Sequence, residues 1–220
     1  MDTGALLLTL RLAAVTTAIL LAVSIPLACW LAYGRSRFRT AVQAVCALPI
    51  VLPPTVLGFY LLIALGPQTG FGRVITHLLG HPLAFSFSGL VVGSVIYSLP
   101  FALQPLVAGF AAVDRSMLDA AATLGSGPMA RMLRVALPLT KPSLLTATVL
   151  AFAHTVGEFG VVLMIGGNLP GATRTLSIAL YDQVQDFNYP QANRTALVLL
   201  AVCFTALIVL YSRRSRSDLV

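Results

Sequence analysis

One acidic side chain and one imidazole stand out because both lie within a long apolar run. Glu158, the only glutamate of the chain, follows His154 by four residues in the run from Ser143 to Ile165. Residues four apart share one face of a helix, so the two side chains could partner each other. A charge at bilayer depth costs roughly 2.5–3.5 kcal/mol on insertion scales and usually faces the helix bundle or a cavity. Glu158 and His154 are therefore candidates for a pathway or for an architectural role.

A structural role for Glu158 is favoured, since a carboxylate touching an anionic substrate would repel it. The surrounding Gly157-Glu158-Phe159-Gly160 sequence also suggests helices that pack closely on small residues. Two arginines are candidate cations for an anion path. Arg174 is expected to lie at the outer interface, and Arg11, which interrupts the first apolar run, is expected to snorkel to the surface.

Motifs for nucleotide and covalent chemistry are missing from the sequence. The one lysine, Lys141, follows a threonine, so the chain lacks a Gly-x-x-x-x-Gly-Lys-Ser/Thr phosphate loop. The histidines and the three cysteines are scattered without metal-ligand spacing, and no nucleophile elbow is found. We expect no catalytic residue, metal or cofactor in this chain, with an intramembrane enzyme as an open alternative.

Composition places the chain in a membrane. It is 58% hydrophobic and 10% charged, whereas soluble domains carry about 25% charged residues. The net charge is +7, but the basic residues flank apolar runs rather than following one helix face. This distribution favours membrane topology over nucleic-acid binding, and we expect lipid and no nucleic acid as a partner.

Five apolar runs predict an all-α integral membrane protein with about five transmembrane helices in a domain of residues 5–212. A hydrocarbon core of about 30 Å needs about 20 apolar residues, and the predicted spans are 5–33, 41–65, 85–113, 143–165 and 194–212. Pro53 and Pro54 predict that the second helix is kinked and packed inside the bundle, and they are also candidate pathway residues. We expect a polar loop around Arg73 and His77, and a short amphipathic segment from Arg174 to Val184.

The basic residues near the span ends predict the orientation. With five spans, one side receives most of them, namely Arg35, Arg37, Arg39, Arg115, Arg131, Arg134, Lys141, Arg213, Arg214 and Arg216. Basic loops are retained in the cytoplasm. We therefore expect the N-terminus outside, and residues 114–138 and a basic tail at 213–220 in the cytoplasm.

The polar interval at 114–138 predicts a helix–turn–helix elbow. Good helix formers fill 116–124, and Asp119 lies near the start, where a negative charge suits the helix dipole. Gly125, Gly127 and Pro128 stop this helix and impose a turn. A second amphipathic stretch follows, with Met129, Met132, Leu133 and Ala136 expected on one face and Arg131 and Arg134 on another. An elbow of this kind at a membrane surface is a candidate docking surface.

The spacing within the elbow resembles the "EAA" signature of ABC importer membrane subunits. That pattern has an acid, two alanines, a glycine four residues later and an aliphatic-x-Leu-Pro ending. It is matched here by Asp119, Ala120, Ala121, Gly125, Val135, Leu137 and Pro138. The one departure is Asp119, where the family usually has glutamate, so its side chain is one methylene shorter.

Three further segments resemble molybdate ABC transporter permeases: residues 48–60, 157–160 and 167–175. The resemblance implies a type I ABC importer permease fold in a bacterial inner membrane, with two copies of the chain forming the pathway. It also implies two cytoplasmic ATPase subunits, which would hold ATP and magnesium and receive the elbow, and a periplasmic molybdate-binding protein. The chain itself would be a non-catalytic subunit that works by alternating access.

Two other classes of function remain as alternatives. Within the permease class, sulfate or tungstate could replace molybdate as the cargo. A stand-alone channel or secondary transporter would predict internal repeats with paired broken helices, and the sequence shows no such repeats. A membrane enzyme would need a catalytic cluster, which the sequence also lacks.

Overall fold

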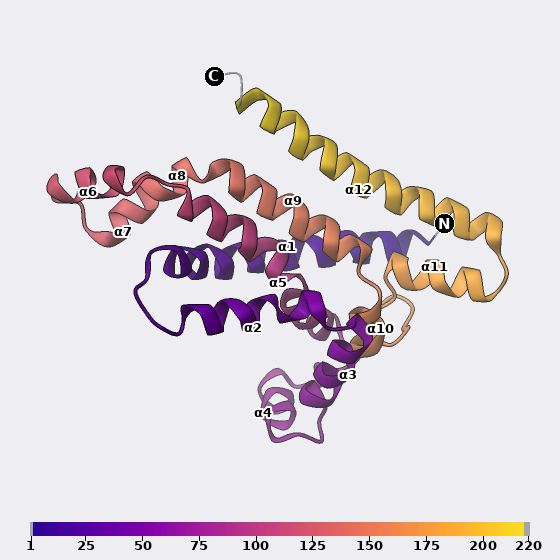
Figure 1. Ribbon diagram of the computed structural model, residues 1–220. Coiled ribbons are helices and arrows are strands. Elements are labelled where there is room, and N and C mark those ends of the chain that lie inside the picture. The colour runs from indigo at the N-terminus through magenta and orange to yellow at the C-terminus, as the bar shows by residue number, and fades with distance from the viewer. Residues whose placement is uncertain (1, 218–220) are drawn as a thin grey trace.

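Three long helices form the centre of the structure, a computed structural model that describes residues 2–217. α1 (Thr3–Tyr33), α5 (Phe87–Ala111) and α9 (Lys141–Gly157) pack against one another (Figure 1). Small side chains and leucines follow one another on the buried face of α1 at intervals of three or four residues: Ala5, Thr9, Leu12, Thr16, Leu20, Ser24, Ala28 and Leu31. This spacing matches the helical period, and small residues let membrane helices approach closely.

The second predicted span is two helices rather than one. α2 (Arg39–Val51) and α3 (Pro54–Leu65) meet at an angle of 113° across the break at Leu52 and Pro53. Consecutive prolines remove two backbone donors and disfavour helix in the residue before them, which explains the break. The expected kink is thus a sharp bend. The expectation that this segment packs inside the bundle is wrong for α2 in the single chain, because Pro49 is the one buried residue described there. α3 buries Gly58 and Leu65 and packs on α10.

The loop expected around Arg73 and His77 contains a helix. α4 (Gly70–Leu79) begins at Thr69, whose hydroxyl accepts a hydrogen bond from the Gly72 amide at 2.9 Å. Most of its apolar side chains, among them Val74, are exposed. The helical spacing of Phe71, Val74 and Leu78 was a local signal for α4, which lies apart from the central helices (Figure 1).

The fourth predicted span is also interrupted. α9 ends at Gly157, and α10 (Gly160–Gly166) begins after a break at Glu158 and Phe159. The expectation that Glu158 lies within a continuous helix is therefore wrong. α10 packs on α3, so the segments next to the two breaks are in contact.

The chain after α10 follows the expectation closely. The short segment is α11 (Leu176–Gln185), capped by the hydroxyl of Thr175, and it packs against α12 (Tyr189–Ser217). α12 also packs along α9. The side chains of the basic tail predicted at 213–220 lie outside the described residues.

The described helices have the length and composition of a multi-pass membrane protein. Three of them, α1, α5 and the Tyr189–Ser212 part of α12, are long and apolar enough to cross a membrane. The number is five if each of two bent pairs is one span: α2 with α3, and Pro128–Leu139 with α9 at 75°. Residues 2–217 contain helices and no strand, so the predicted all-α class is confirmed.

Candidate functional site

The elbow is a helix–turn–helix that extends beyond the bundle at the end where α5 finishes. α6 (Arg115–Thr123) begins after Asp114, whose carboxylate accepts a hydrogen bond from the Ser116 amide at 2.9 Å. This backbone hydrogen bond holds the pKa of the Asp114 carboxyl below its usual value. The carboxylate therefore caps the first turn of α6 at neutral pH.

Gly125 closes α6 in a Schellman motif. The Gly125 amide donates to the carbonyl of Ala122 and the Ser126 amide donates to that of Ala121, both at 3.0 Å. Gly125 has a φ of +80°, a left-handed conformation that glycine adopts without strain. The glycine of the signature is thus required by the turn, and Ala121 supplies one of the two carbonyls that the turn satisfies.

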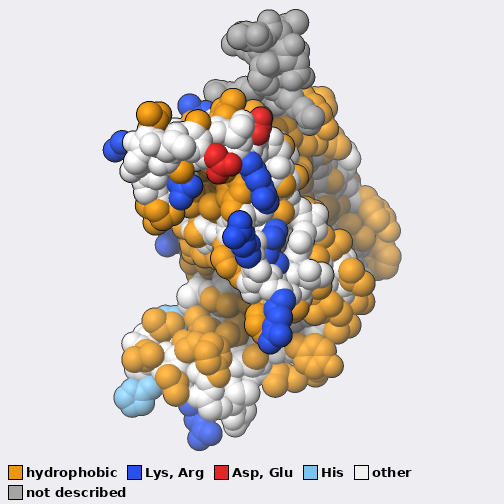
Figure 2. All heavy atoms as spheres, turned by 60° about the vertical axis from the view of Figure 1, so that its left-hand side comes forward, with side chains coloured by type: hydrophobic (Ala, Val, Ile, Leu, Met, Phe, Trp, Pro, Cys, Tyr) orange, Lys and Arg blue, Asp and Glu red, His pale blue; other side chains and the backbone are white. Residues whose placement is uncertain are grey.

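The outer half of the elbow is exposed and apolar. Among its described residues α6 has no buried side chain, and both Asp119 and Ala120 are exposed. Leu124 is 87% exposed and Met129 is 64% exposed. Figure 2 shows Lys and Arg side chains beside acidic ones on the face that carries the elbow. Exposed apolar side chains with charged ones beside them keep this end of the elbow a candidate docking surface.

The inner half of the elbow is anchored in the core. α7 (Pro128–Arg131) continues through a π-helical turn at Met132–Ala136 into α8 (Leu137–Leu139). Ala136 is fully buried and Leu137 packs beside it, in a cluster with Leu31 and Phe110 of α1 and α5. The expected common apolar face is only partly present, because Leu133 is exposed whereas Ala136 is buried.

The π-helical turn lies just before Pro138, where the chain lacks an amide donor. A wider turn at this point accommodates the proline ring without breaking the helical path. Val135 is half-buried and Pro138 is exposed. α7, the π-helical turn and α8 thus connect the exposed α6 to the start of α9.

A cleft of about 470 Å³ lies at the break between α9 and α10, and its lining includes Pro54, Thr55, Tyr97, His154 and Glu158. It brings together three of the residues singled out in the sequence and leaves Pro53 outside its lining. The helices approach closely here, because a Cβ added to Gly160 would lie 2.7 Å from Cβ of Pro54. The expected close packing around Gly157-Glu158-Phe159-Gly160 thus occurs at Gly160.

Glu158 and His154 do not form the expected pair. His154 Nδ1 lies 2.9 Å from the hydroxyl of Ser98, and its ring stacks on Phe101 at 3.8 Å between centroids. Neither carboxyl oxygen of Glu158 has a hydrogen-bond partner in the described part of the chain. The hydroxyl of Ser94 faces Glu158 but does not reach hydrogen-bond geometry with it. The helix break after Gly157 turns Glu158 away from the α9 face that carries His154.

The order of hydroxyls beside His154 indicates its tautomer. Thr155 donates its hydroxyl proton to the carbonyl of Ala151 at 2.9 Å, so in its 3.1 Å contact with Ser98 it accepts. The hydroxyl of Ser98 thus donates its single proton to Thr155 and accepts a hydrogen bond from Nδ1–H of His154. In the neutral ring the other nitrogen is then an acceptor.

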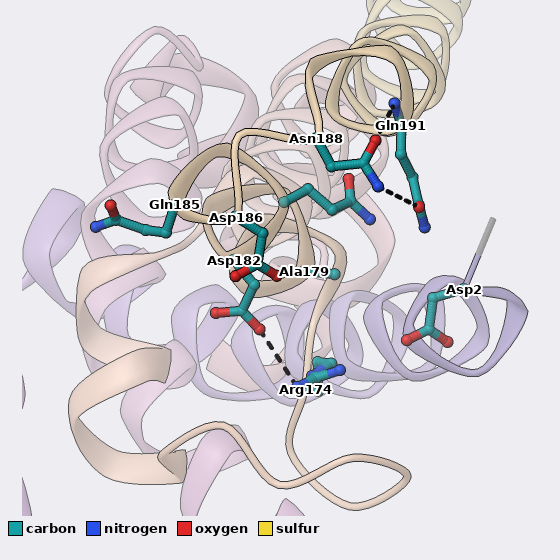
Figure 3. Close-up of a pocket in the computed structure, with 9 residues that line it drawn as sticks. Asp2, Arg174, Ala179, Asp182, Gln185, Asp186, Asn188 and Gln191 are labelled. Atoms are coloured by element: carbon teal, nitrogen blue, oxygen red, sulfur yellow. Dashed lines mark hydrogen bonds and ion pairs between the residues drawn. The ribbon is translucent and has the colours of Figure 1, made fainter.

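Arg174 is held in an ion pair on the other side of α10. Its Nη2 lies 3.3 Å from Asp182 (Figure 3). Its Nε donates to Asn168 at 2.6 Å. Asn168 in turn donates to Asp182 at 2.7 Å. The adjoining pocket of about 330 Å³ is also lined by Asp2 and Asp186, so carboxylates outnumber the single guanidinium. These contacts fix the loop before α11. The excess of carboxylates would repel an anion, so the pocket is a poor anion site.

Arg11 is the second candidate cation. It is exposed, and its guanidinium carbon lies 4.6 Å from the centroid of the Phe87 ring. This is a cation–π contact on the outside of the bundle, consistent with a snorkelling side chain.

Comparison with known sequences identifies the family. The sequence profile of the family described as "Binding-protein-dependent transport system inner membrane component" matches residues 24–215. The chain belongs to this family. It is 50% identical to the molybdenum transport system permease protein ModB of Azotobacter vinelandii, over 97% of this chain and 94% of the relative. It is 33% identical to the protein of that name in Escherichia coli K12, over 78% and 75% of the two chains.

Solved structures of ABC transporters share the fold. A chain of the MetNI methionine ABC transporter in an inward-facing conformation superposes with a TM-score of 0.77 at 16% identity, covering 99% of this chain and 95% of its own. A chain of a bacterial ABC transporter that imports alginate gives the same score at 18% identity, covering 97% and 78%. The expected importer permease fold is confirmed. The alternative of a secondary transporter is not favoured, although broken helices do occur in this inner membrane component.

Sequence reasoning missed Thr55 and Tyr97 as companions of Glu158 in the cleft lining, and Ser98 as the partner of His154. Each lies on α3 or α5, far along the chain from α9. The one local signal for Thr55 was its place directly after the two prolines.

Proposed function

We propose that the chain is the membrane-spanning permease subunit of an ATP-driven molybdate importer. The observation that carries the proposal is the elbow: an exposed apolar end at Leu124 joined through a short helix to the buried Ala136. Such a surface would be costly to leave in water and is explained by a docked partner. The permease relatives named for molybdenum transport support the substrate.

The elbow would dock in a groove on a cytoplasmic ATPase subunit, one for each of two permease copies. ATP and magnesium would be bound by the ATPases, and this chain would take no part in covalent chemistry. Closure of the ATPases would move α6, and the connection through Ala136 would pass the movement to the bundle as a rigid-body rotation. Alternating access would then receive the anion from a periplasmic binding protein.

The second copy would cover the apolar faces of α2 and α3. Large side chains stay exposed there, among them Val51 at 80% and Tyr60 at 64%. A homodimer around these segments would enclose the two helix breaks and form the pathway between the copies. Lipid would cover the remaining apolar surface.

The orientation we propose has the elbow in the cytoplasm and the N-terminus in the periplasm. The hydroxyl of Tyr33 at the end of α1 donates to the carbonyl of Phe110 at 2.8 Å. This contact brings the basic segment from Arg35 to Arg39 to the elbow end of the bundle. Two basic segments on one side support a cytoplasmic location by the positive-inside rule.

Transport by the complete importer tests the proposal. The chain, its ATPase and its binding protein are reconstituted in vesicles, and ATP-dependent molybdate uptake is measured with sulfate or tungstate as competitor. We expect uptake that resists excess sulfate and is lost in Gly125→Pro, which leaves the spans inserted but disrupts the elbow. Uptake abolished by sulfate or by tungstate would keep the permease role and change the ion. Uptake independent of ATP would contradict the permease role.

A further inference from the structure

The cleft at Glu158 has the features of a site rather than of a packing defect. It lies where the break between α9 and α10 meets the break between α2 and α3, with Gly160 against Pro54. Irregular backbone at membrane depth is tolerated where it is buried in protein or lines a cavity. The volume of about 470 Å³ exceeds the roughly 30 Å³ of one water more than tenfold. A tetrahedral oxyanion fits with part of its hydration shell.

The unpaired carboxyl of Glu158 needs an explanation. Its residue is 4% exposed and neither oxygen is satisfied within residues 2–217. The described cleft lining contains no lysine or arginine that could neutralise it. A buried carboxylate without a counter-ion is very costly, and such a group takes up a proton instead. In that form the carboxyl is an O–H donor.

The other polar groups of the cleft are also neutral. Thr55 and Tyr97 contribute hydroxyls, and His154 uses its Nδ1–H for Ser98. The cleft therefore offers hydroxyl donors without a fixed positive charge, beside the acceptor nitrogen of His154. Conduction requires binding that is favourable enough for entry and weak enough for exit, and neutral donors meet both conditions.

We propose that this cleft is a transient binding site for the tetrahedral oxyanion, in which Glu158, as a neutral carboxylic acid, turns its buried carboxyl toward the cleft and donates a hydrogen bond to the passing anion together with the hydroxyls of Thr55 and Tyr97. The proposal rests on the proposed function. It replaces the architectural role that repulsion suggested, because a protonated carboxyl attracts an anion that a carboxylate would repel.

Uptake in reconstituted vesicles with the ATPase and the binding protein tests this site, with labelled molybdate counted per ATP hydrolysed. Glu158→Gln keeps a neutral donor, and we expect its uptake to stay within about threefold of the unmodified chain. Glu158→Met keeps the approximate size and loses the donor. Since hydrogen bonds to charged groups are the strong ones, its uptake should fall about tenfold to a hundredfold. ATP hydrolysis stimulated by the binding protein should persist in both variants.

Two hydroxyl variants keep the test independent of how Glu158→Met folds. Thr55→Val removes a donor from the cleft, and we expect uptake about tenfold lower. Thr205→Val is the matched control, since that exposed hydroxyl of α12 donates to its own helix at Ala201, 2.7 Å away. Its uptake should not change.

The outcomes separate this proposal from the proposed function. Absence of ATP-dependent uptake in the unmodified importer would defeat the permease function and this site with it. Normal uptake by the unmodified chain combined with normal uptake in Glu158→Met and Thr55→Val would overturn the site alone. A Glu158→Gln variant as impaired as Glu158→Met would show that a neutral hydrogen-bond donor at this position does not support transport, which also overturns it.

Discussion

The left-handed turn at Gly125 allows the mechanical role of the elbow to be tested by a graded perturbation. Gly125 has a φ of +80°, and a Cβ added there would meet no described atom of this chain within 4 Å. Replacement by alanine therefore introduces a backbone cost with no clash inside the chain. A non-glycine residue in this conformation costs about 1–2 kcal/mol, and that corresponds to about fivefold to thirtyfold in an equilibrium.

The magnitude predicts an order among variants of Gly125. Asparagine tolerates the left-handed region and should lower ATPase docking least, alanine should lower it about fivefold to thirtyfold, and valine, which is β-branched, should lower it most. The measurement is the affinity of the purified ATPase subunit for the permease in detergent, together with ATP hydrolysis stimulated by the binding protein.

Asparagine and alanine together separate the backbone explanation from a steric one. Asparagine is larger than alanine, so a clash with the ATPase would make the asparagine variant the weaker of the two. If the backbone conformation sets the cost, the asparagine variant docks more tightly than the alanine variant. Docking that is weaker with asparagine than with alanine, or equal to that of the unmodified chain with valine, would refute the reasoning.

Two further predictions concern close packing and capping. Gly160→Ala should lower the free energy of unfolding of the purified protein by about 1–3 kcal/mol, because its methyl group would lie 2.7 Å from Cβ of Pro54. Gly157→Ala is the matched control: its methyl group meets no described atom within 4 Å, and stability should be unchanged or slightly higher. The Ser116 hydrogen bond lowers the pKa of Asp114 when the elbow is folded, so the carboxylate stabilises α6 above its unfolded pKa. This contribution should disappear as the pH falls below about 3.8 and through the folded pKa. Protection of the α6 amides against hydrogen exchange should therefore decrease over this range in the unmodified chain. It should not change with pH in this way in Asp114→Asn.

The local features of this protein were predictable from short stretches of sequence. Long apolar runs predicted α1 and α5, since hydropathy over about 20 residues decides whether a helix can cross a membrane. The glycines and Pro128 predicted the turn of the elbow, because the left-handed φ at Gly125 is a property of one residue.

The partners of the functional side chains were decided by the tertiary structure. His154 and Glu158 are suitably spaced for a pair on one helix, yet the break after Gly157 separates them and Ser98 of α5 takes the imidazole. No proline lies between residues 143 and 169 to cause that break, and it occurs where α10 packs against α3. Likewise, Ala136 is an anchor only because α1 and α5 meet there. Hydrogen bonds and close contacts between helices depend on residues far apart in the chain, and local spacing does not encode them.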